Sequence, residues 1–384
     1  MTGRILQFGT SRFLQAHVDL FVHEAREAGQ PVGPIAVVQA SGSAERAGRV
    51  AAFGRPGGFP VIIRGIEKGA PVERRIQVTS VDRGLAAARD WEELSALFAG
   101  ETDAVVSNMG DTGYEVAAAD RHPALLSGTA VPHSFPGKLL ALLHRRWRDG
   151  GRSLTVLPCE LVSRNGEVLA AILAGLARDA GAPAGFLDWM AGSVTIGNTL
   201  VDRIVSQPLD PIGAVAEPYA LWAIERRPGL SAPCGHPAIV MTDDLERFER
   251  LKLHILNLGH SVLADLWMAE RRDPDETVRA ILADGRVRDR LESLYRTEVV
   301  PGFAARGMAA EAEAYVATTL DRFLNPFLDH RIADIAQNHP AKVGKRIGDF
   351  LAWVCGAGSA RHATPLLDGV LGAVLARPAE GIRS

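Results

Sequence analysis

A lysine, an asparagine and a histidine lie close together in the otherwise apolar run LKLHILNLGH, residues 251–260. On an α-helix, Asn257 lies about 140° around the axis from Lys252 and His260 lies about 80° from it, so all three share one side. Burial lowers the pKa of a lysine towards neutrality, which makes the amine usable as a general base. An amide can donate to an oxygen that becomes negative, and a histidine can orient the same hydroxyl. The spacing indicates proton removal from an alcohol during hydride transfer.

The same three residues also permit a purely structural interpretation. The surrounding apolar residues predict a buried helix, in which Lys252 extends its amine to water, Asn257 satisfies a backbone group and His260 packs in the core. Other catalytic motifs are absent from the sequence. No tyrosine has a lysine four residues further on, and there is no HExxH, GxSxG or P-loop motif.

The turn after the first predicted strand has the residue types of a nucleotide-binding turn. It reads Gly9-Thr10-Ser11-Arg12, and such a turn lets a pyrophosphate approach the backbone N–H groups that open the next helix. Ser11 stands where the GxGxxG motif has its second glycine, so an ordinary strand-to-helix turn fits equally well. The end of the second predicted strand offers Gln39, Ala40, Ser41 and Ser43, then Arg46, and lacks the acidic residue that holds the ribose of NAD, which leaves NADP open as well.

Alternating strand and helix patterns fill the first half of the chain. Strands are predicted at 4–8, 35–43, 61–66, 74–81, 104–108 and 154–161, and helices at 13–28, 90–98, 136–149 and 166–178. This alternation predicts a doubly wound, mainly parallel Rossmann-like sheet. Past about residue 205 strand signals nearly vanish and long helical patterns follow. We therefore expect an α/β nucleotide-binding domain at 1–206 and a mostly α-helical substrate domain at 207–384, linked by QPLDPIGAVAEP (207–218).

The composition of the 384 residues limits the class of protein. The chain is 47% hydrophobic and 23% charged with a net charge of −3, which is typical of a globular protein and gives no basic face for nucleic acid. Cys159, Cys234 and Cys355 lie far apart, which argues against a disulfide framework or a zinc site and fits a reducing cytoplasm. No signal-like or membrane-spanning segment is present. We expect a cytoplasmic monomer or small homo-oligomer with no metal, membrane or nucleic-acid partner.

Several ordered blocks resemble the mannitol dehydrogenase family of zinc-independent, polyol-specific long-chain dehydrogenases. They are the Lys-x4-Asn-x2-His pattern at 252–260, GTSRFLQAH (9–17), VVSN (105–108), SFPGKL (134–139), NTLVDRIV (198–205), EPYALW (217–222) and DRFLNPFLDH (321–330). The block VLPCELVSRNG (156–166) is similar to the tagaturonate and fructuronate reductases, because polyol dehydrogenases tend to carry Asp-Asn where this chain has Glu160-Leu161. Ser11 and Gln15 depart from the glycine and arginine of many members, and the chain is shorter than is typical of the uronate reductases.

The resemblance implies an NAD(P)-dependent oxidoreductase in which Lys252 is the general acid/base, Asn257 stabilises the oxyanion and His260 orients the substrate. It implies NAD as the cofactor, with NADP not excluded, and cofactor binding by Gly9, Thr10, Ser11, Phe13, Gln39, Ser107, Asn108 and Asn198. It implies substrate binding by Glu160, Asn165, Arg322, His330 and Lys342. The leading interpretation is a reductase that interconverts a keto-hexuronate and its aldonate. The alternatives are a polyol or polyol-phosphate 2-dehydrogenase, and a nucleotide-binding regulator that has lost catalysis.

Overall fold

The computed structural model describes residues 2–41, 47–110, 112–128, 130–356 and 363–376, and it divides into two compact units. Unit 1 comprises Met1–Ile63, Arg74–Ala216 and Ala220–Leu245, and unit 2 comprises Arg64–Glu73, Glu217–Tyr219 and Glu246–Ser384. Unit 1 therefore continues past the predicted boundary at 206/207. Unit 2 is not one continuous stretch of chain, because two short segments from earlier in the sequence belong to it.

The strands lie in unit 1, except for residues 64–73, which form the hairpin end of the third and fourth strands and belong to unit 2. The strands are β1 (Arg4–Phe8), β2 (Ile35–Gln39), β3 (Phe59–Glu67), β4 (Ala70–Val78), β5 (Val81–Ala86), β6 (Thr102–Ser107), β7 (Leu154–Pro158), β8 (Val194–Ile196), β9 (Thr199–Asp202), β10 (Val205–Pro208), β11 (Ala214–Ala216), β12 (Leu221–Glu225) and β13 (Ile239–Thr242). The helices of unit 1 are α1 (Arg12–Gln15), α2 (Val18–Glu27), α3 (Ala47–Phe53), α4 (Trp91–Gly100), α5 (Phe135–Arg148), α6 (Asn165–Asp179) and α7 (Ala184–Ser193), with 3₁₀ turns η2 (Ala118–Asp120) and η3 (Pro123–Leu126).

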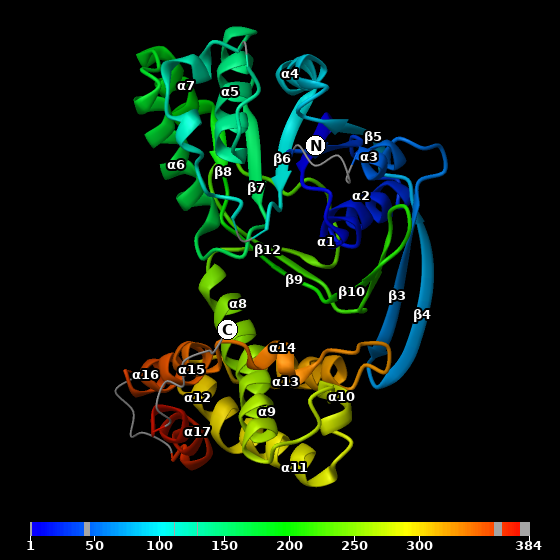
Figure 1. Ribbon diagram of the computed structural model, residues 1–384, viewed down its shortest axis with the longest axis vertical. Helices are drawn as coiled ribbons and strands as arrows, with labels where there is room; N and C mark the ends of the chain where they lie inside the picture. Colours follow the sequence, from blue (N-terminus) through cyan, green and yellow to red (C-terminus); the bar gives the residue numbers. More distant parts are fainter. Residues whose placement is uncertain (1, 42–46, 111, 129, 357–362, 377–384) are drawn as a thin grey trace. The chain divides into compact units, whose positions relative to one another are not determined.

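Six strands form one parallel sheet in the order β5-β2-β1-β6-β7-β8. Its central strands are apolar and buried on both faces, as parallel strands covered by helices usually are. Leu6 and Phe8 pack on one side with residues of α4, α5 and α6, whereas Ile5 packs on the other with residues of α2. Figure 1 shows α5, α6 and α7 gathered beside β7 and β8. The predicted Rossmann-like sheet is confirmed.

Some strands lie outside that sheet. The predicted strands at 61–66 and 74–81 correspond to β3 and β4, which belong to a separate sheet of order β10-β11-β3-β4. Lys68 and Gly69 join them with φ values of +53° and +75°, as a two-residue type I′ hairpin turn requires. A third sheet has the order β13-β12-β9. The prediction that strands end near residue 205 is wrong, because β11 to β13 are too short and too often separated by proline and glycine to show a period.

Unit 2 is built from helices around one apolar core, which confirms the predicted helical half. Its elements are α8 (Leu245–Leu251), η4 (Lys252–Asn257), α9 (Leu258–Ala269), α10 (Val278–Ile281), α11 (Gly285–Leu294), η5 (Tyr295–Val299), α12 (Val300–Ala304), α13 (Ala309–Phe323), α14 (Ile332–Ala336), α15 (His339–Val343), η6 (Gly344–Gly348), α16 (Asp349–Cys355) and α17 (Pro365–Ala376). The segments η4, η5 and η6 are π-helical turns within longer helices. Among the described residues, none of the helices has the length and apolarity needed to span a membrane.

Candidate active site

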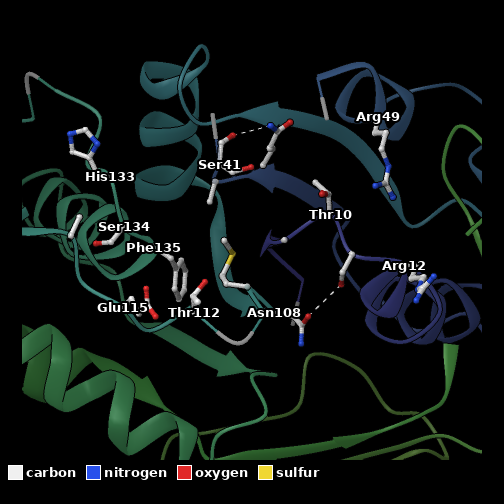
Figure 2. Close-up of a pocket in the computed structure, with 18 of the residues that line it drawn as sticks. Thr10, Arg12, Ser41, Arg49, Asn108, Thr112, Glu115, His133, Ser134 and Phe135 are labelled. Carbon is white, nitrogen blue, oxygen red and sulfur yellow. Dashed lines mark hydrogen bonds between the residues drawn. The ribbon is translucent and has the colours of Figure 1, made fainter. Parts of the chain in front are cut away.

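Unit 1 carries a cavity of about 890 Å³ at the carboxyl ends of β1, β2 and β6. In doubly wound sheets, ligands bind at this edge where the strand order reverses, and here β1 lies between β2 and β6. Figure 2 shows Thr10 and Arg12 from the turn after β1, Ser41 after β2, Asn108 and Thr112 after β6, and Ser134 and Phe135 at the start of α5. The wall also includes Gly9, Ser11, Gln39, Ala40, Arg49, Met109, Gly110, Gly113, Glu115, Val116, Ala117, His133 and Pro208. A cavity of this volume is typical of a small-molecule or cofactor site.

The backbone of the turn after β1 is fixed by one glycine and by the hydrogen bonds of two polar side chains. Gly9 has a φ of +117°, and a Cβ there would lie 2.5 Å from the Asn108 carbonyl oxygen, so a side chain cannot be accommodated. The Ser11 hydroxyl accepts a hydrogen bond from Leu14 N and caps α1. Gln15 donates to the Thr10 carbonyl and accepts from Gly213 N at 2.6 Å. Ser11 and Gln15, which depart from the family pattern, thus support the shape of the turn.

A buried carboxylate fixes the part of the wall that precedes α5. Asp120 accepts hydrogen bonds from His133 N at 2.8 Å and Ser134 N at 2.7 Å. Burial alone would raise the pKa of Asp120, but these bonds and one from the Ser134 hydroxyl hold it below its usual value. The buried Lys138 amine donates to the His133 carbonyl at 2.7 Å. The family-matching block at 134–139 therefore shapes the pocket wall.

Glu160 holds the loop after β6 rather than facing the cavity. Its carboxylate accepts hydrogen bonds from the Ser107 hydroxyl at 3.0 Å and from Met109 N at 3.2 Å, and the Tyr114 hydroxyl lies 3.4 Å away. Burial raises the pKa of Glu160. The predicted substrate-binding role is not supported, because the carboxylate is buried and engaged by this loop. Asn108, within the same loop, lines the pocket as predicted.

Asn165 and Asn198 are also used inside the protein. The Asn165 amide donates to the carbonyls of Pro158, Glu160 and Thr199 and accepts from Thr199 N, so both of its polar atoms are engaged within the protein. Asn198 donates to Glu225 at 2.8 Å and accepts from Glu167 N. These predicted ligand roles are therefore not supported.

Three of the predicted cofactor residues do not line the cavity: Phe13, Ser107 and Asn198. Phe13 stacks on His17 with ring centroids 4.7 Å apart, and Ser107 donates to Glu160. Gly9, Thr10, Ser11, Gln39 and Asn108 do line it.

The pocket wall fits a dinucleotide. Arg12 and Arg49 supply positive charge for a diphosphate, and hydroxyls from Thr10, Ser41 and Thr112 supply hydrogen bonds. At the end of β2 the Gln39 amide donates to the Ser41 carbonyl at 2.8 Å. Across the part of the chain that the structure describes, no group of three His, Cys, Asp or Glu side chains is arranged to hold a metal ion.

Unit 2 carries Lys252, Asn257 and His260, all on one helix that runs through α8, η4 and α9. The sequence predicted α-helical spacing, but Lys252–Asn257 form a π-helical turn. Because π-helical hydrogen bonds link residue i to i+5 instead of i+4, Asn257 lies closer to the Lys252 side than the predicted 140°. Single π turns inside α-helices are frequently found at functional sites. Lys252 and Asn257 are partly buried and His260 is buried.

Side chains from the two other π turns bind carbonyl oxygens of η4. The Tyr295 hydroxyl donates to the Ile255 carbonyl at 3.0 Å, and Arg346 Nη1 donates to the Asn257 carbonyl at 3.3 Å. A Cβ on Gly259 would lie 2.0 Å from the Tyr295 hydroxyl oxygen, so only glycine leaves room for it. These donors compensate carbonyls that the wider turn displaces from ordinary helical partners.

His260 lies in an aromatic and basic environment. Its ring centroid is 4.5 Å from that of Phe323 and 5.0 Å from that of His330. Burial lowers the pKa of His330; the charge of Asp334 opposes this shift, and the charge of Lys342 adds to it. The structure thus brings together the predicted residues His260, His330 and Lys342.

Arg322 occupies a different environment from the one predicted. Its guanidinium forms an ion pair with Glu217 at 2.9 Å, with side-chain exposures of 2% and 1%, and lies 4.5 Å from the Tyr219 ring centroid. A guanidinium that is already neutralised in this way does not need a substrate carboxylate. The predicted substrate-binding role of Arg322 finds no support in this geometry, because Glu217 already supplies its counterion.

Sequence reasoning missed Arg346, which lies four residues after Lys342. That spacing is a helical one and could have shown that the two cations are neighbours.

The chain belongs to the mannitol dehydrogenase family. Residues 3–232 match the mannitol dehydrogenase Rossmann domain, and residues 244–370 match the mannitol dehydrogenase C-terminal domain. It is an oxidoreductase of that family, as the sequence predicted.

Among curated relatives, the altronate oxidoreductase of Halalkalibacterium halodurans is 29% identical, over 90% of this chain and 69% of its own length. That of Bacillus subtilis is 28% identical, over 89% of this chain and 73% of its own.

Two solved structures share the fold. A D-sorbitol dehydrogenase in substrate-free form has a TM-score of 0.74 at 20% identity, covering 96% of this chain and 85% of that one. The Pseudomonas fluorescens mannitol 2-dehydrogenase, solved with NAD and D-mannitol, has a TM-score of 0.70 at 20% identity, covering 98% of this chain and 79% of that one.

Proposed function

We propose that this protein is an NAD-dependent oxidoreductase that interconverts a keto-hexuronate of the tagaturonate or fructuronate type and the corresponding aldonate. The observation that carries the proposal is the placement of Lys252 and Asn257 at the two ends of one π-helical turn, with His260 following in α9, in a chain related to altronate oxidoreductases over nine-tenths of its length. NAD fits the pocket of unit 1, and when bound it accepts or donates the hydride.

The proton chemistry falls to residues of unit 2. Lys252 takes the proton of the C–OH group during oxidation and returns it during reduction. The Asn257 amide donates to the substrate oxygen while that oxygen carries negative charge. His260, fixed by ring contacts with Phe323 and His330, orients the same hydroxyl. Together these residues supply proton transfer and oxyanion stabilisation from side chains alone.

The uronate substrate class is supported by the altronate oxidoreductase relatives and by the Pro158-Cys159-Glu160-Leu161 block. Glu160 acts as a positioning residue for the loop that presents Asn108 and Met109 to the pocket. A block that sets loop shape can distinguish one branch of a family from another without touching the substrate.

The proposal is tested by following NADH and NADPH oxidation with tagaturonate, fructuronate and fructose, together with NAD reduction by altronate, mannonate and mannitol. We expect the uronates to be reduced with NADH at a catalytic efficiency at least about 10³-fold above that for fructose, since each 1.4 kcal/mol of discrimination is about tenfold. Comparable efficiency on fructose would favour a polyol dehydrogenase. Cofactor binding without turnover of any compound would favour a regulatory protein.

A further inference from the structure

The helix that carries Lys252, Asn257 and His260 is contacted by a cation that sequence reasoning did not identify. Arg346, in the π turn η6, places Nη1 3.0 Å from the Ser261 hydroxyl and 3.3 Å from the Asn257 carbonyl. The guanidinium therefore contacts the backbone of one proposed catalytic residue, Asn257, and the side chain of Ser261, the residue that follows another, His260. The His254 ring, in η4, hydrogen-bonds the Arg346 carbonyl at 3.0 Å and ties the two π turns together from the other direction.

Arg346 retains unused hydrogen-bonding capacity. A guanidinium has five N–H donors, and the hydrogen bonds of the Arg346 side chain to described residues use Nη1 alone. Within the described part of the chain it forms no ion pair with a carboxylate, unlike Arg322 with Glu217. Burial lowers the pKa of Arg346. A partly buried arginine that has no acidic partner is incompletely compensated, so an anionic ligand that pairs with it would bind more tightly.

A second cation lies next to it. Lys342 precedes Arg346 by four residues, and after burial the charge of Arg346 is the second cause that lowers the pKa of Lys342. The Lys342 amine donates to the Ile335 carbonyl at 2.8 Å, and its charge also reaches His330. Two neighbouring cations repel each other, and a carboxylate bound by both would remove that repulsion.

We propose that Arg346, with Lys342 beside it, forms the subsite that binds the carboxylate of a sugar-acid substrate next to His260. This inference rests on the proposed function and specifies its substrate class. The unused edge of the guanidinium can make two parallel hydrogen bonds to a carboxylate, which a CH₂OH group cannot accept in the same way. Discrimination between a uronate and a neutral ketose then comes from this pair of cations, and Arg322 has no part in it.

The test compares Arg346→Gln, Arg346→Lys and Lys345→Gln, the last being a matched control because Lys345 is an exposed cation on the same π turn. For each variant, steady-state constants are measured with fructuronate, tagaturonate and fructose. In parallel, calorimetry gives the dissociation constants of NADH and, with NADH present, of altronate and mannonate. Thermal unfolding checks that every variant is folded.

We expect Arg346→Gln to raise the KM for the uronates and the dissociation constants of the aldonates about 10²-fold. NADH affinity should stay within about twofold, and the catalytic efficiency on fructose should fall much less than that on the uronates, since fructose loses only the support that Arg346 gives to η4. Arg346→Lys should recover about tenfold of the loss, because it keeps the charge but not the bidentate geometry. Lys345→Gln should behave as the wild type.

Equal losses on fructose and on the uronates would overturn the inference, because Arg346 would then only support the helix. An unchanged aldonate dissociation constant in Arg346→Gln would overturn it too, even if the wild type is an efficient uronate reductase. If the wild type does not discriminate against fructose, the proposed substrate class fails on its own, and the aldonate measurement still decides the role of Arg346.

Discussion

Lys252 is the side chain on which the proposed proton transfer depends most directly, and Asn257 is its partner across the π turn. We expect Lys252→Ala to lower kcat by about 10²–10⁴-fold, the usual range for loss of a general acid/base. Asn257→Ala should lower kcat by about 10²-fold through loss of a donor to the oxyanion. Both variants should bind NADH normally and unfold at the wild-type temperature. A normal kcat for Lys252→Ala would exclude this lysine from the mechanism.

Residue types and the family resemblance together identified part of the pocket wall, namely Gly9, Thr10, Ser11, Gln39 and Asn108, but they could not assign the roles of buried polar side chains. Asn165 and Glu160 have the chemistry of ligands, and the sequence predicted that they bind substrate. Their partners come from Thr199 on β9 and from the loop after β6, which are remote in the sequence. The ion-pair partner of Arg322 was hidden for the same reason, since Glu217 is also remote in the sequence. Such pairings depend on tertiary contacts that spacing does not contain.

At the scale of elements, the spacing of apolar residues was sufficient to predict the strands of the six-stranded sheet, except for the two strands at its edges. The edge strand β5 reads VDRGLA and has no apolar run, and the opposite edge strand β8 has three residues, so neither shows a period. The π turns were also not predictable. A π turn contains one more residue than an α-helical turn, and converting sequence spacing to angles with the α-helical value ignores that residue. That extra residue changes the angle between Lys252 and Asn257, which is the angle that matters for chemistry.

The π turn η4 depends on the close approach of Tyr295 to Gly259. Gly259→Ala would place a methyl group where the Tyr295 hydroxyl lies, so we expect a loss of about 1–3 kcal/mol in the free energy of unfolding and a lower kcat. Tyr295→Phe alone removes one hydrogen bond and should cost about 0.5–1.5 kcal/mol.

The double variant Gly259→Ala/Tyr295→Phe tests whether Gly259→Ala destabilises the protein through a collision with the Tyr295 hydroxyl, because it removes that hydroxyl. Chemical denaturation of all four proteins should show that the double variant is more stable than the sum of the two single losses predicts. Simple additivity of the losses would mean that the hydroxyl is not the obstacle.

At the scale of the molecule, the stability of unit 1 should depend on one buried acid. Asp19 is fully buried, burial raises its pKa well above its usual value, and Gln7 Nε2 lies 3.5 Å away. Above about pH 4 the unfolded chain releases this proton whereas the folded chain keeps it, so folding loses stability as pH rises. The substituted side chain of Asp19→Asn is neutral in both the folded and the unfolded state. The free energy of unfolding of this variant should therefore rise relative to that of the wild type as pH increases.

Thermal unfolding between pH 4 and pH 8 measures this difference. We expect Asp19→Asn to be more stable than the wild type at pH 7 by about 1 kcal/mol or more, with the gap closing towards pH 4. The exposed Asp188 provides the control, and Asp188→Asn should follow the wild type throughout. A gap that is constant with pH would mean that Asp19 is already ionised in the folded protein.

The ion pair between Arg322 and Glu217 has a consequence for how the chain can be divided. Unit 2 draws Glu217–Tyr219 and Arg64–Glu73 from earlier in the sequence, and Asn325 donates to the Arg64 carbonyl at 3.4 Å. A fragment that begins at residue 246 would bury the Arg322 guanidinium without its counterion, at a cost of about 3–5 kcal/mol, which is comparable to the whole stability of many domains. The helical half is therefore not a transferable module: recombination or gene fission at the junction between the two family-matching regions would separate residues that fold only as a set.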